Sequence, residues 1–579
     1  MKKTKIVATI GPASESEDIL KILFTEGVNV ARLNFSHGSH EEHKIKIDRI
    51  KKLRKEMDLP IGIMLDTKGP EIRLGEVDGE VSLEIGDKFI LTSEDLLGDK
   101  TIASISYKEL YKDVKVGDRI LIDDGLVELL VKDIDGEKII TEVENSGVIS
   151  SHKGVNVPGV DIKLPALTER DIEDIRFGVK EDIDFIAASF IRSREDVLAI
   201  RKVLEEESDY TTKIISKIES QKAVELIDEI IEVSDGIMVA RGDLGVEIET
   251  EAVPIVQKEI IKKCNVAGKT VITATQMLDS MIRNPRPTRA ETNDVANAVL
   301  DGTSAVMLSG ETASGKYPVE AVETMRKIIE YTESTIDHDE ILENRIKDVE
   351  NSMTNSIGRS ACVIARDLHA NAIITATTSG NTSKAIAKFR PETPIIASTP
   401  FEKIKNQLSL VWGVRPVKVL NFKDTDNLID ASMEVAVKKG FLKSGDLVVL
   451  TAGVPTGIAG STNLLKIENV SEILGRGTAI GKKKKKKKAR AVVVNTFEEL
   501  EANFQSKDII ICNGTDGRMI PYMEKSSGFV TEEAGFTSNG AVSAISLNKT
   551  AIVGVRDITK LIKTGDIITI DGTDGTVRR

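Results

Sequence analysis

Two carboxylates and a lysine stand close together where buried strands are expected to end. Lys217 and Glu219 are two residues apart, so in a strand both side chains point to the same side. Asp243 follows the next apolar run. Two carboxylates that leave positions open for substrate oxygens and water suit Mg2+ or Mn2+. A divalent metal beside an ammonium group, with Arg32 and Arg73 near by, is typical of phosphoryl transfer, which relies on positioning and charge neutralisation.

A second group of polar side chains follows the second and third apolar runs. Asn34, Ser36, Asp66 and Thr67 offer neutral or singly charged oxygens. This mixture suits a monovalent cation, and it suits a plain hydrogen-bond network equally well. The sequence contains neither a Walker loop (GxxxxGK[ST]) nor the glycine-rich loop of protein kinases. A nucleotide must therefore be held in another way.

These polar residues lie at the ends of apolar runs that alternate with amphipathic stretches. Strands are predicted over 5–10, 28–35, 61–65, 185–190, 213–218, 236–240, 270–274 and 305–308. Helical patterns follow them, and Ser39 is placed to cap one that runs to about Met57. Eight βα units predict a (β/α)8 barrel, whose active site lies at the carboxyl ends of the strands. A single open doubly wound sheet is the alternative, but polar residues at six of the strand ends favour a functional barrel.

The remaining segments predict further domains. Short β-type runs between Asp-Gly turns interrupt the barrel, and another α/β pattern follows it, with 447–450 as its last clear strand. Seven consecutive lysines, 482–488, indicate a solvated linker, with an anion-binding or targeting patch as the alternative. We assign 1–70 and 166–345 to the barrel, 71–165 to an inserted β domain, 346–475 to an α/β domain, 476–490 to the linker and 491–579 to a fourth module.

Composition excludes several functional classes. The net charge of −13 argues against nonspecific binding to nucleic acid, which requires a basic surface. The cysteines, Cys264, Cys362 and Cys512, are far apart and form no CxxC pair, so neither a zinc site nor a disulfide framework is indicated. No stretch approaches the roughly 18 apolar residues of a spanning helix, and the N-terminus is not a signal peptide. We expect a cytoplasmic protein without a membrane partner.

Six long motifs resemble those of the pyruvate kinase family, and the resemblance covers roughly residues 1–475. They are residues 4–14, 31–38, 65–73, 216–219, 238–245 and 273–278. The resemblance implies transfer of the phosphoryl group of phosphoenolpyruvate to ADP, the last step of glycolysis. A dikinase or synthase would need a phosphohistidine and an ATP-grasp module, and neither is found. A catalytically inactive metabolite sensor would be expected to have lost Lys217, Glu219 or Asp243.

The resemblance implies roles for individual residues of the barrel. Arg32 and Lys217 would contact the phosphoryl group of the substrate, with Lys217 stabilising it in flight. Glu219 and Asp243 would bind the Mg2+ or Mn2+ that bridges substrate oxygens and steadies the pyruvate enolate. The substrate carboxylate would be held by Gly242 and Thr275, and Thr275 would lie near the path of proton delivery.

The resemblance also implies a K+ site and a nucleotide site. Potassium would be bound by Asn34, Ser36, Asp66 and the carbonyl of Thr67, and Glu71 is the residue type that accompanies K+ dependence. The nucleotide phosphates would be contacted by Arg73, Lys153, His37 and Asn34. The inserted domain would then be a lid that closes over the cleft and excludes water.

The α/β domain resembles the allosteric domain of the family, which suggests a homotetramer. Its loop Thr377, Thr378, Ser379, Gly380, Asn381 and Thr382 opens a helix whose backbone N–H groups could receive a phosphorylated effector, with 453–460 as a facing loop. A helix cap is the alternative. The tail resembles the swivelling phosphohistidine domain of phosphoenolpyruvate-utilising enzymes, but Asn539 stands in the place of the histidine. We therefore expect a structural or regulatory tail rather than a phosphocarrier.

Overall fold

The chain divides into two compact units. The structure, a computed structural model, describes residues 2–420, 425–453, 462–481 and 486–579. One unit comprises Met1–Val435 with Val449–Lys466, and the other comprises Ala436–Val448 with Ile467–Arg579. The second unit therefore begins within the segment assigned to the α/β domain from the sequence.

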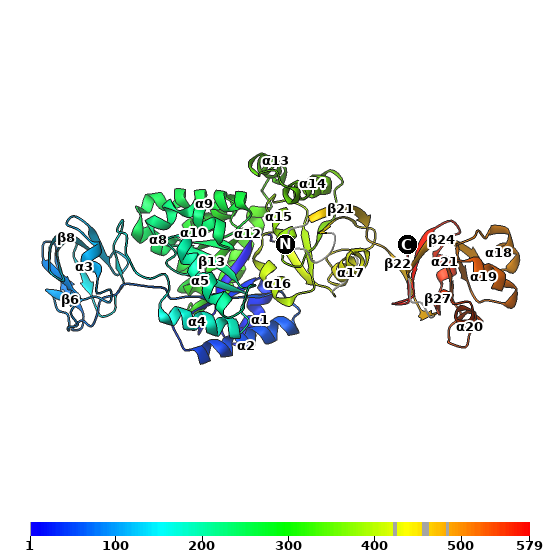
Figure 1. The fold of residues 1–579 in the computed structure, drawn as a ribbon, viewed down its shortest axis with the longest axis horizontal. Helices are drawn as coiled ribbons and strands as arrows, with labels where there is room; N and C mark the ends of the chain where they lie inside the picture. The colour runs from blue at the N-terminus through cyan, green and yellow to red at the C-terminus, as the bar shows by residue number, and fades with distance from the viewer. Residues whose placement is uncertain (1, 421–424, 454–461, 482–485) are drawn as a thin grey trace. The chain divides into compact units, whose positions relative to one another are not determined.

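Eight parallel strands form a closed barrel in the first unit, in the order β1-β16-β15-β14-β13-β12-β3-β2 (Figure 1). Their bounds are β1 (Lys5–Thr9), β2 (Val30–Asn34), β3 (Gly62–Asp66), β12 (Phe185–Ala188), β13 (Lys213–Ile218), β14 (Gly236–Ala240), β15 (Thr270–Ala274) and β16 (Ala305–Leu308). Each strand coincides with a predicted one, and the prediction of a (β/α)8 barrel is confirmed. The inside of the barrel is packed with residues such as Val7, Met64 and Ile272, so it is a core and not a channel.

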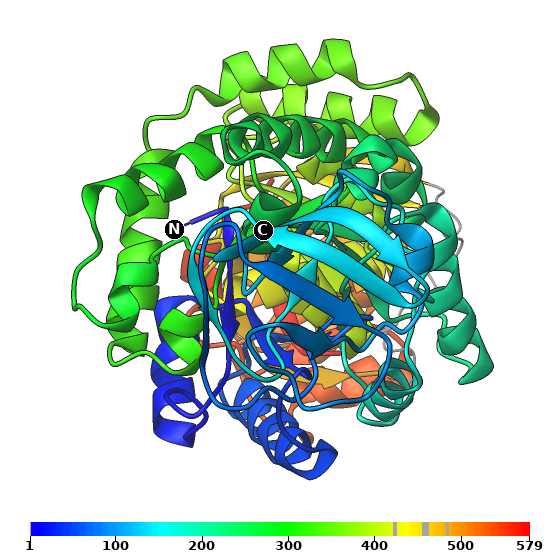
Figure 2. The same cartoon turned by 90° about the vertical axis from the view of Figure 1, so that its left-hand side faces the viewer.

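Helices lie around the outside of these strands (Figure 2). They are α1 (Glu17–Glu26), α2 (His40–Glu56), α4 (Glu169–Lys180), α5 (Arg194–Glu206), α6 (Gln221–Glu225), α7 (Ile227–Val233), α8 (Arg241–Glu247), α9 (Val253–Ala267), α10 (Arg289–Leu300), α11 (Gly310–Ala313) and α12 (Pro318–Glu333). The predicted cap is confirmed, because Ser39 and Glu42 form a capping box at the start of α2. A large apolar cluster, including Leu20, Ile47 and Ile260, joins the helices to the strands.

The inserted segment folds mainly as β-structure. A six-stranded sheet has the order β11-β7-β8-β9-β5-β6, and β4 pairs with β10. The bounds are β4 (Val81–Leu83), β5 (Lys88–Thr92), β6 (Ile102–Ser104), β7 (Arg119–Ile122), β8 (Val127–Asp135), β9 (Lys138–Val143), β10 (Gly147–Ile149) and β11 (Val155–Asn156), with one short helix, α3 (Leu110–Asp113). Its own apolar cluster, including Phe89, Leu129 and Ile139, gives this segment a core separate from that of the barrel.

The α/β segment contains a five-stranded sheet of order β19-β18-β17-β20-β21. Its strands are β17 (Ala372–Ala376), β18 (Ile395–Thr399), β19 (Val414–Lys418), β20 (Leu447–Gly453) and β21 (Thr462–Asn469), and its helices are α13 (His338–Asp348), α14 (Met353–Asp367), α15 (Asn381–Ala387), α16 (Glu402–Gln407) and α17 (Thr425–Lys438). The expectation that 447–450 is the last strand is wrong, because β21 follows it. Both β19 and β21 are edge strands; β19 contains Pro416, and β21 is rich in polar residues, so their sequences lack a strand signal.

The second unit contains an eight-stranded sheet of order β22-β29-β28-β24-β25-β26-β27-β23. Its strands are β22 (Ile473–Arg476), β23 (Thr478–Ile480), β24 (Lys486–Val494), β25 (Ile509–Cys512), β26 (Gly528–Thr531), β27 (Thr550–Val553), β28 (Ile567–Asp571) and β29 (Thr576–Arg578), and its helices are α18 (Phe497–Asn503), α19 (Ile520–Lys525), α20 (Asn539–Ser546) and α21 (Ile558–Leu561).

The predicted lysine-rich linker, 476–490, differs from the structure. Lys486, Lys487 and Lys488 begin β24 and pair with Asp571, Ile570 and Thr569 of β28 in an antiparallel ladder. Their backbone groups are satisfied by the ladder, while a lysine side chain can lie along a strand and keep its ammonium in water. The other lysines of the run, 482–485, lie outside the described residues.

Within the described ranges, no helix is both long enough and apolar enough to span a bilayer. All three cysteines are buried and free.

Candidate active site

The barrel brings most of the predicted site residues to one rim. The strands are parallel, so their carboxyl ends meet at the same end of the barrel. Asn34 is in register with Asp66, and Asp66 with Ala187 of the neighbouring strand. Lys217 lies near the end of β13, and Asp243 lies in the first turn of α8, just after β14. The parallel strands thus bring these predicted site residues to the same end of the barrel.

The carboxylate of Asp66 pairs with two cationic side chains at the rim. It is 1% exposed, its Oδ2 accepts from Nε of Arg32 at 2.5 Å, and its Oδ1 lies 3.3 Å from Nζ of Lys217. Burial opposes ionisation of this carboxyl, but Arg32 and Lys217 outweigh burial and hold its pKa below the usual value. Nη1 of Arg32 also donates to Oγ1 of Thr9 at 2.8 Å. The guanidinium is thus fixed from two strands.

Lys217 stays charged although it is buried. Desolvation would lower its pKa, but the attraction of Asp66 and then of Glu219 raises the pKa above the ordinary lysine value. Its Nζ lies 2.7 Å from Oε1 of Glu219 and donates to Oγ of Ser189 at 2.8 Å. An ammonium fixed by three neighbours in a site of low dielectric can stabilise negative charge that develops close to it.

Glu219 and Asp243 have the electrostatics of a metal site. Burial raises the pKa of each carboxyl; repulsion from Asp243 raises that of Glu219 further, and repulsion from Asp124 raises that of Asp243. Both residues line one cavity of about 430 Å3. A divalent cation would remove this repulsion, so the donor set fits Mg2+ or Mn2+. Among the described residues, no three His, Cys, Asp or Glu side chains gather at a metal-binding distance, so substrate and water would supply the other ligands.

Thr275 lies in a strained turn after β15. Its φ of 67° and the φ of 53° at Gln276 fall in the left-handed region, which is rare for a β-branched residue. The N–H of Gly242 donates to Oγ1 of Thr275 at 2.8 Å, and this hydroxyl donates to the carbonyl of Ala274. The predicted pair for the substrate carboxylate is thus brought into contact.

Arg241 supports this turn, although the sequence analysis gave it no role in the site. Its guanidinium donates to the carbonyl of Thr275 at 2.7 Å and to that of Ala274 at 3.2 Å. Its Nη1 lies 2.7 Å from Oδ1 of Asp294 on α10. The signal available in the sequence was its position directly after β14, beside Gly242 and Asp243.

The predicted K+ ligands are neighbours, but the oxygens of Asn34, Asp66 and Thr67 already have partners in the protein. Oδ1 of Asn34 accepts from the N–H of Ser36 at 3.1 Å. The carbonyl of Thr67 accepts from Oγ of Ser189 at 2.7 Å, and both carboxylate oxygens of Asp66 face cations. The set offers oxygens only, which suits a hard monovalent ion, and each carbonyl oxygen can accept a second contact.

Two of the predicted nucleotide contacts, Arg73 and Lys153, form a separate group. Arg73 pairs with Gly154 in an isolated β-bridge, which places it next to Lys153. Arg73 lies 2.6 Å from Oε2 of Glu71, and Lys153 lies 2.7 Å from Oδ2 of Asp123. The side chain of His37 is exposed, and its carbonyl accepts from Nε2 of His43. Arg73 and Lys153 thus lie at the base of the inserted domain, apart from Lys217.

The predicted effector loop connects β17 to α15. Oγ1 of Thr377 accepts from the N–H of Gly380, whose φ of 85° allows the sharp turn into the helix. Oγ1 of Thr382 shares a hydrogen bond of 2.8 Å with Oγ1 of Thr462. The facing loop lies outside the described residues, apart from Gly453.

Comparison with known proteins agrees with this geometry. Residues 1–322 match "Pyruvate kinase, barrel domain", residues 355–468 match "Pyruvate kinase, alpha/beta domain", and residues 504–575 match "PEP-utilising enzyme, mobile domain". Pyruvate kinases of Staphylococcus haemolyticus and Geobacillus stearothermophilus are each 50% identical to the chain, over 100% of its length and 99% of theirs. A crystal structure of a pyruvate kinase from Cryptosporidium parvum has 40% identity and a TM-score of 0.78, and the match covers 81% of this chain and 96% of that one. Since the barrel family model covers more than half of the chain and full-length relatives are 50% identical to it, the chain belongs to the pyruvate kinase family.

Proposed function

We propose that Lys217 lies beside the phosphoryl group while it passes from phosphoenolpyruvate to ADP at this rim. The observation that carries the proposal is the buried ammonium of Lys217, 2.7 Å from Glu219 and 3.3 Å from Asp66. Its charge is fixed where a transferring phosphoryl group spreads negative charge over its oxygens. Arg32, oriented by Asp66, would contact the same phosphoryl group from the neighbouring side.

The remaining substrate groups would be held by residues that follow β13, β14 and β15. Glu219 and Asp243 would bind Mg2+ or Mn2+, which supplies positive charge to the substrate oxygens when bound. The N–H of Gly242 and the hydroxyl of Thr275 would orient the substrate carboxylate after exchanging their present acceptors, Oγ1 of Thr275 and the carbonyl of Ala274, for its oxygens. Because the turn at Thr275 is braced by Arg241, its hydroxyl has a defined direction and lies near the route by which a proton would reach the product.

The cation and nucleotide roles are proposed for the residues around Asp66 and at the base of the inserted domain. Asn34, Ser36, Asp66 and the carbonyl of Thr67 would hold K+. Arg73, Lys153, His37 and Asn34 would contact the nucleotide phosphates, Arg73 and Lys153 after exchanging their present carboxylate partners for phosphate oxygens. The inserted β domain would act as a lid over the bound substrates.

The regulatory proposals concern the other domains. A phosphorylated metabolite would bind the loop that contains Thr377, Thr378, Ser379, Gly380, Asn381 and Thr382, and it would activate the enzyme in a cytoplasmic homotetramer. Support comes from the hydroxyl-rich composition of this loop and the match of residues 355–468. The idea is abandoned if no phosphorylated metabolite shifts the dependence of the rate on phosphoenolpyruvate.

A single assay tests the catalytic proposal. Pyruvate formation is measured from phosphoenolpyruvate and ADP with Mg2+, once with K+ and once with Na+ only. Turnover that requires K+ supports the whole site, including the group around Asp66. Equal turnover without K+ removes the monovalent site and keeps the metal site, while no turnover in either buffer contradicts the catalytic proposal.

A further inference from the structure

The turn that follows β12 has an unusual backbone. It contains Ser189, which is 4% exposed, and Phe190, whose φ is 54°. A left-handed conformation is rare for a bulky aromatic residue and is strained. Such a conformation persists only where the surrounding structure imposes it.

The hydroxyl of Ser189 faces the ammonium of Lys217. Nζ of Lys217 donates to Oγ of Ser189 at 2.8 Å, and Oγ donates its own proton to the carbonyl of Thr67 at 2.7 Å. The N–H of Ser189 also donates to Oγ1 of Thr67 at 3.2 Å. Because a hydroxyl has one proton, its donation to Thr67 leaves a lone pair directed at Lys217.

The N–H of Phe190 faces the carboxylate that pairs with the same lysine. It donates to Oε2 of Glu219 at 2.6 Å, while Oε1 of Glu219 lies 2.7 Å from Nζ of Lys217. Two successive residues therefore fix both members of the Lys217–Glu219 pair. The left-handed φ of Phe190 is part of the turn that directs its N–H toward Glu219.

Packing around the end of β3 keeps the turn in place. A Cβ atom on Gly69 would lie 2.6 Å from Cδ2 of Phe190 and 2.9 Å from Cβ of Ser189. Gly69 is itself held, because its N–H donates to Oδ1 of Asp171 at 3.0 Å. The Ser189–Phe190 turn thus packs so closely against Gly69 that a larger residue at position 69 would not fit.

We infer that the Ser189–Phe190 turn is a positioning element for phosphoryl transfer. Ser189 directs the ammonium of Lys217, and Phe190 directs the carboxylate of Glu219. Neither residue is required to contact substrate, so each acts through its partner. The inference rests on the proposed roles of Lys217 and Glu219.

The first test removes the hydroxyl. Ser189→Ala is expected to lower kcat about tenfold to hundredfold, the cost of a misplaced catalytic group, with the KM for phosphoenolpyruvate nearly unchanged. Ser189→Thr, which keeps the hydroxyl, is expected to recover most of that loss. The matched control is Ser234→Ala, which removes a buried hydroxyl bonded to Ser216 near the amino end of β14 and should leave kcat unchanged. An unchanged kcat in Ser189→Ala, or an equal loss in Ser234→Ala, overturns the inference.

A double-mutant cycle separates this inference from the proposed function. If Ser189 acts through Lys217, adding Ser189→Ala to Lys217→Gln should cause no further loss of kcat, and an additional full loss contradicts that. If Lys217→Gln alone keeps wild-type kcat, the proposed function fails, whatever Ser189 does.

The role of Phe190 has a readout that does not depend on turnover. Phe190→Gly keeps the N–H but frees the turn, so the free enzyme should bind Mn2+ about three- to tenfold more weakly by electron paramagnetic resonance. Ser234→Ala should bind Mn2+ as the wild type does. Wild-type affinity in Phe190→Gly would overturn the assignment for Phe190.

Discussion

At the scale of single residues, the site contains more buried carboxylate charge than the neighbouring cationic side chains of the protein balance. Asp66 pairs with both Arg32 and Lys217, one through each carboxylate oxygen. Glu219 shares Lys217 with Asp66, and Asp243 has repulsive neighbours. This excess of buried carboxylate at one side of the rim is the physical reason to expect a divalent cation there.

Removal of either carboxylate should therefore weaken metal binding. We expect Glu219→Gln and Asp243→Asn each to lower the Mn2+ affinity of the free enzyme by about tenfold to hundredfold or more, measured by electron paramagnetic resonance. Glu247→Gln is the matched control, because Glu247 lines the same cavity but is held by Nδ2 of Asn156. Equal losses in all three variants would indicate a general effect of cavity charge instead of direct ligation.

Arg241 provides a second test at this scale. Arg241→Lys loses the planar fork that reaches two carbonyls and Asp294 together, so Thr275 should lose its fixed orientation. We expect kcat/KM for phosphoenolpyruvate to fall about tenfold to hundredfold. The control is Arg326→Lys, which alters a guanidinium paired with Glu26 and Glu330 away from the rim. It should change kcat/KM little. A normal kcat/KM in Arg241→Lys would show that the turn does not need this brace.

The sequence predicted those site residues whose relation is local. Lys217 and Glu219 are two positions apart in one strand, so alternation alone puts them on one side. Roles for Ser189 and Arg241 were not predicted, because their contacts depend on how neighbouring strands are aligned and on left-handed turns at Phe190 and Thr275. Such conformations are set by tertiary packing, and no spacing rule reports them.

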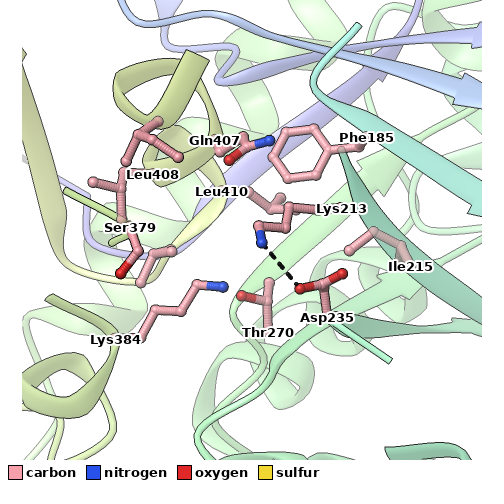
Figure 3. Close-up of a pocket in the computed structure, with 12 residues that line it drawn as sticks. Phe185, Lys213, Ile215, Asp235, Thr270, Ser379, Lys384, Gln407, Leu408 and Leu410 are labelled. Atoms are coloured by element: carbon pink, nitrogen blue, oxygen red, sulfur yellow. Dashed lines mark ion pairs between the residues drawn. The ribbon is translucent and has the colours of Figure 1, made fainter. Parts of the chain in front are cut away.

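At the scale of elements, the amino ends of β13 to β15 lie against the α/β domain. A small cavity there is lined by Lys213, Asp235 and Thr270 from the barrel and by Ser379 and Lys384 from the loop and helix α15 (Figure 3). Nζ of Lys213 lies 3.3 Å from Oδ1 of Asp235. Helix α15 follows the predicted effector loop, so Lys384 lines this cavity together with the strands whose other ends carry the proposed site.

Asp235 should contribute stability that depends on pH. Burial opposes its ionisation, but Lys213, Lys384 and Arg201 lower its pKa to about 2. A lowered carboxyl pKa stabilises the fold above about pH 4, and this contribution is lost as pH falls toward 2. Asp235→Asn should therefore reduce the free energy of unfolding at pH 7 by about 2 kcal/mol, measured by urea unfolding followed through Trp412 fluorescence. The difference from wild type should shrink below pH 4, and a constant difference would contradict the assignment.

Lys384 should show the opposite dependence. Desolvation lowers its pKa to about 8, and among the described side chains none accepts a hydrogen bond from its ammonium or pairs with it. A lysine with a lowered pKa costs stability at pH 7, and the cost disappears as pH rises from 8 to about 10. Lys384→Met should therefore have a higher Tm than wild type at pH 7 and an equal one near pH 10. A lower Tm at pH 7 would mean that the attraction of Asp235 outweighs desolvation.

The helices and strands could be predicted where their hydrophobic pattern reflects how deeply they are buried in the fold. The barrel strands are buried on both faces and appear as continuous apolar runs, so their positions were recovered closely. Strands β19 and β21 were missed because sheet edges tolerate Pro416 and polar residues. The run of lysines was misread because charge pattern alone does not reveal that Lys486–Lys488 pair with β28.

At the scale of the whole molecule, three family matches follow one another along the chain, and the third is the tail. The histidine of a phosphocarrier is missing there: Asn539 is the first residue of α20, and no histidine follows His369 in the sequence. Cys512, the one cysteine of the tail, is 2% exposed, and burial raises its pKa to about 12. Neither a histidine nitrogen nor a thiolate is therefore available in the tail at neutral pH.

The tail should consequently remain unphosphorylated during turnover. We expect no covalent label in residues 467–579 after incubation with radiolabelled phosphoenolpyruvate, alkaline quenching and proteolytic mapping, because an amide nitrogen is not a nucleophile. Asn539→His is the informative comparison, since it restores a ring nitrogen at the start of α20 without altering the cap that Ser538 provides. Label in Asn539→His alone would show that the missing nucleophile is what prevents transfer. A stable phosphoenzyme in the wild-type tail would contradict the structural or regulatory role and make the tail a phosphocarrier after all.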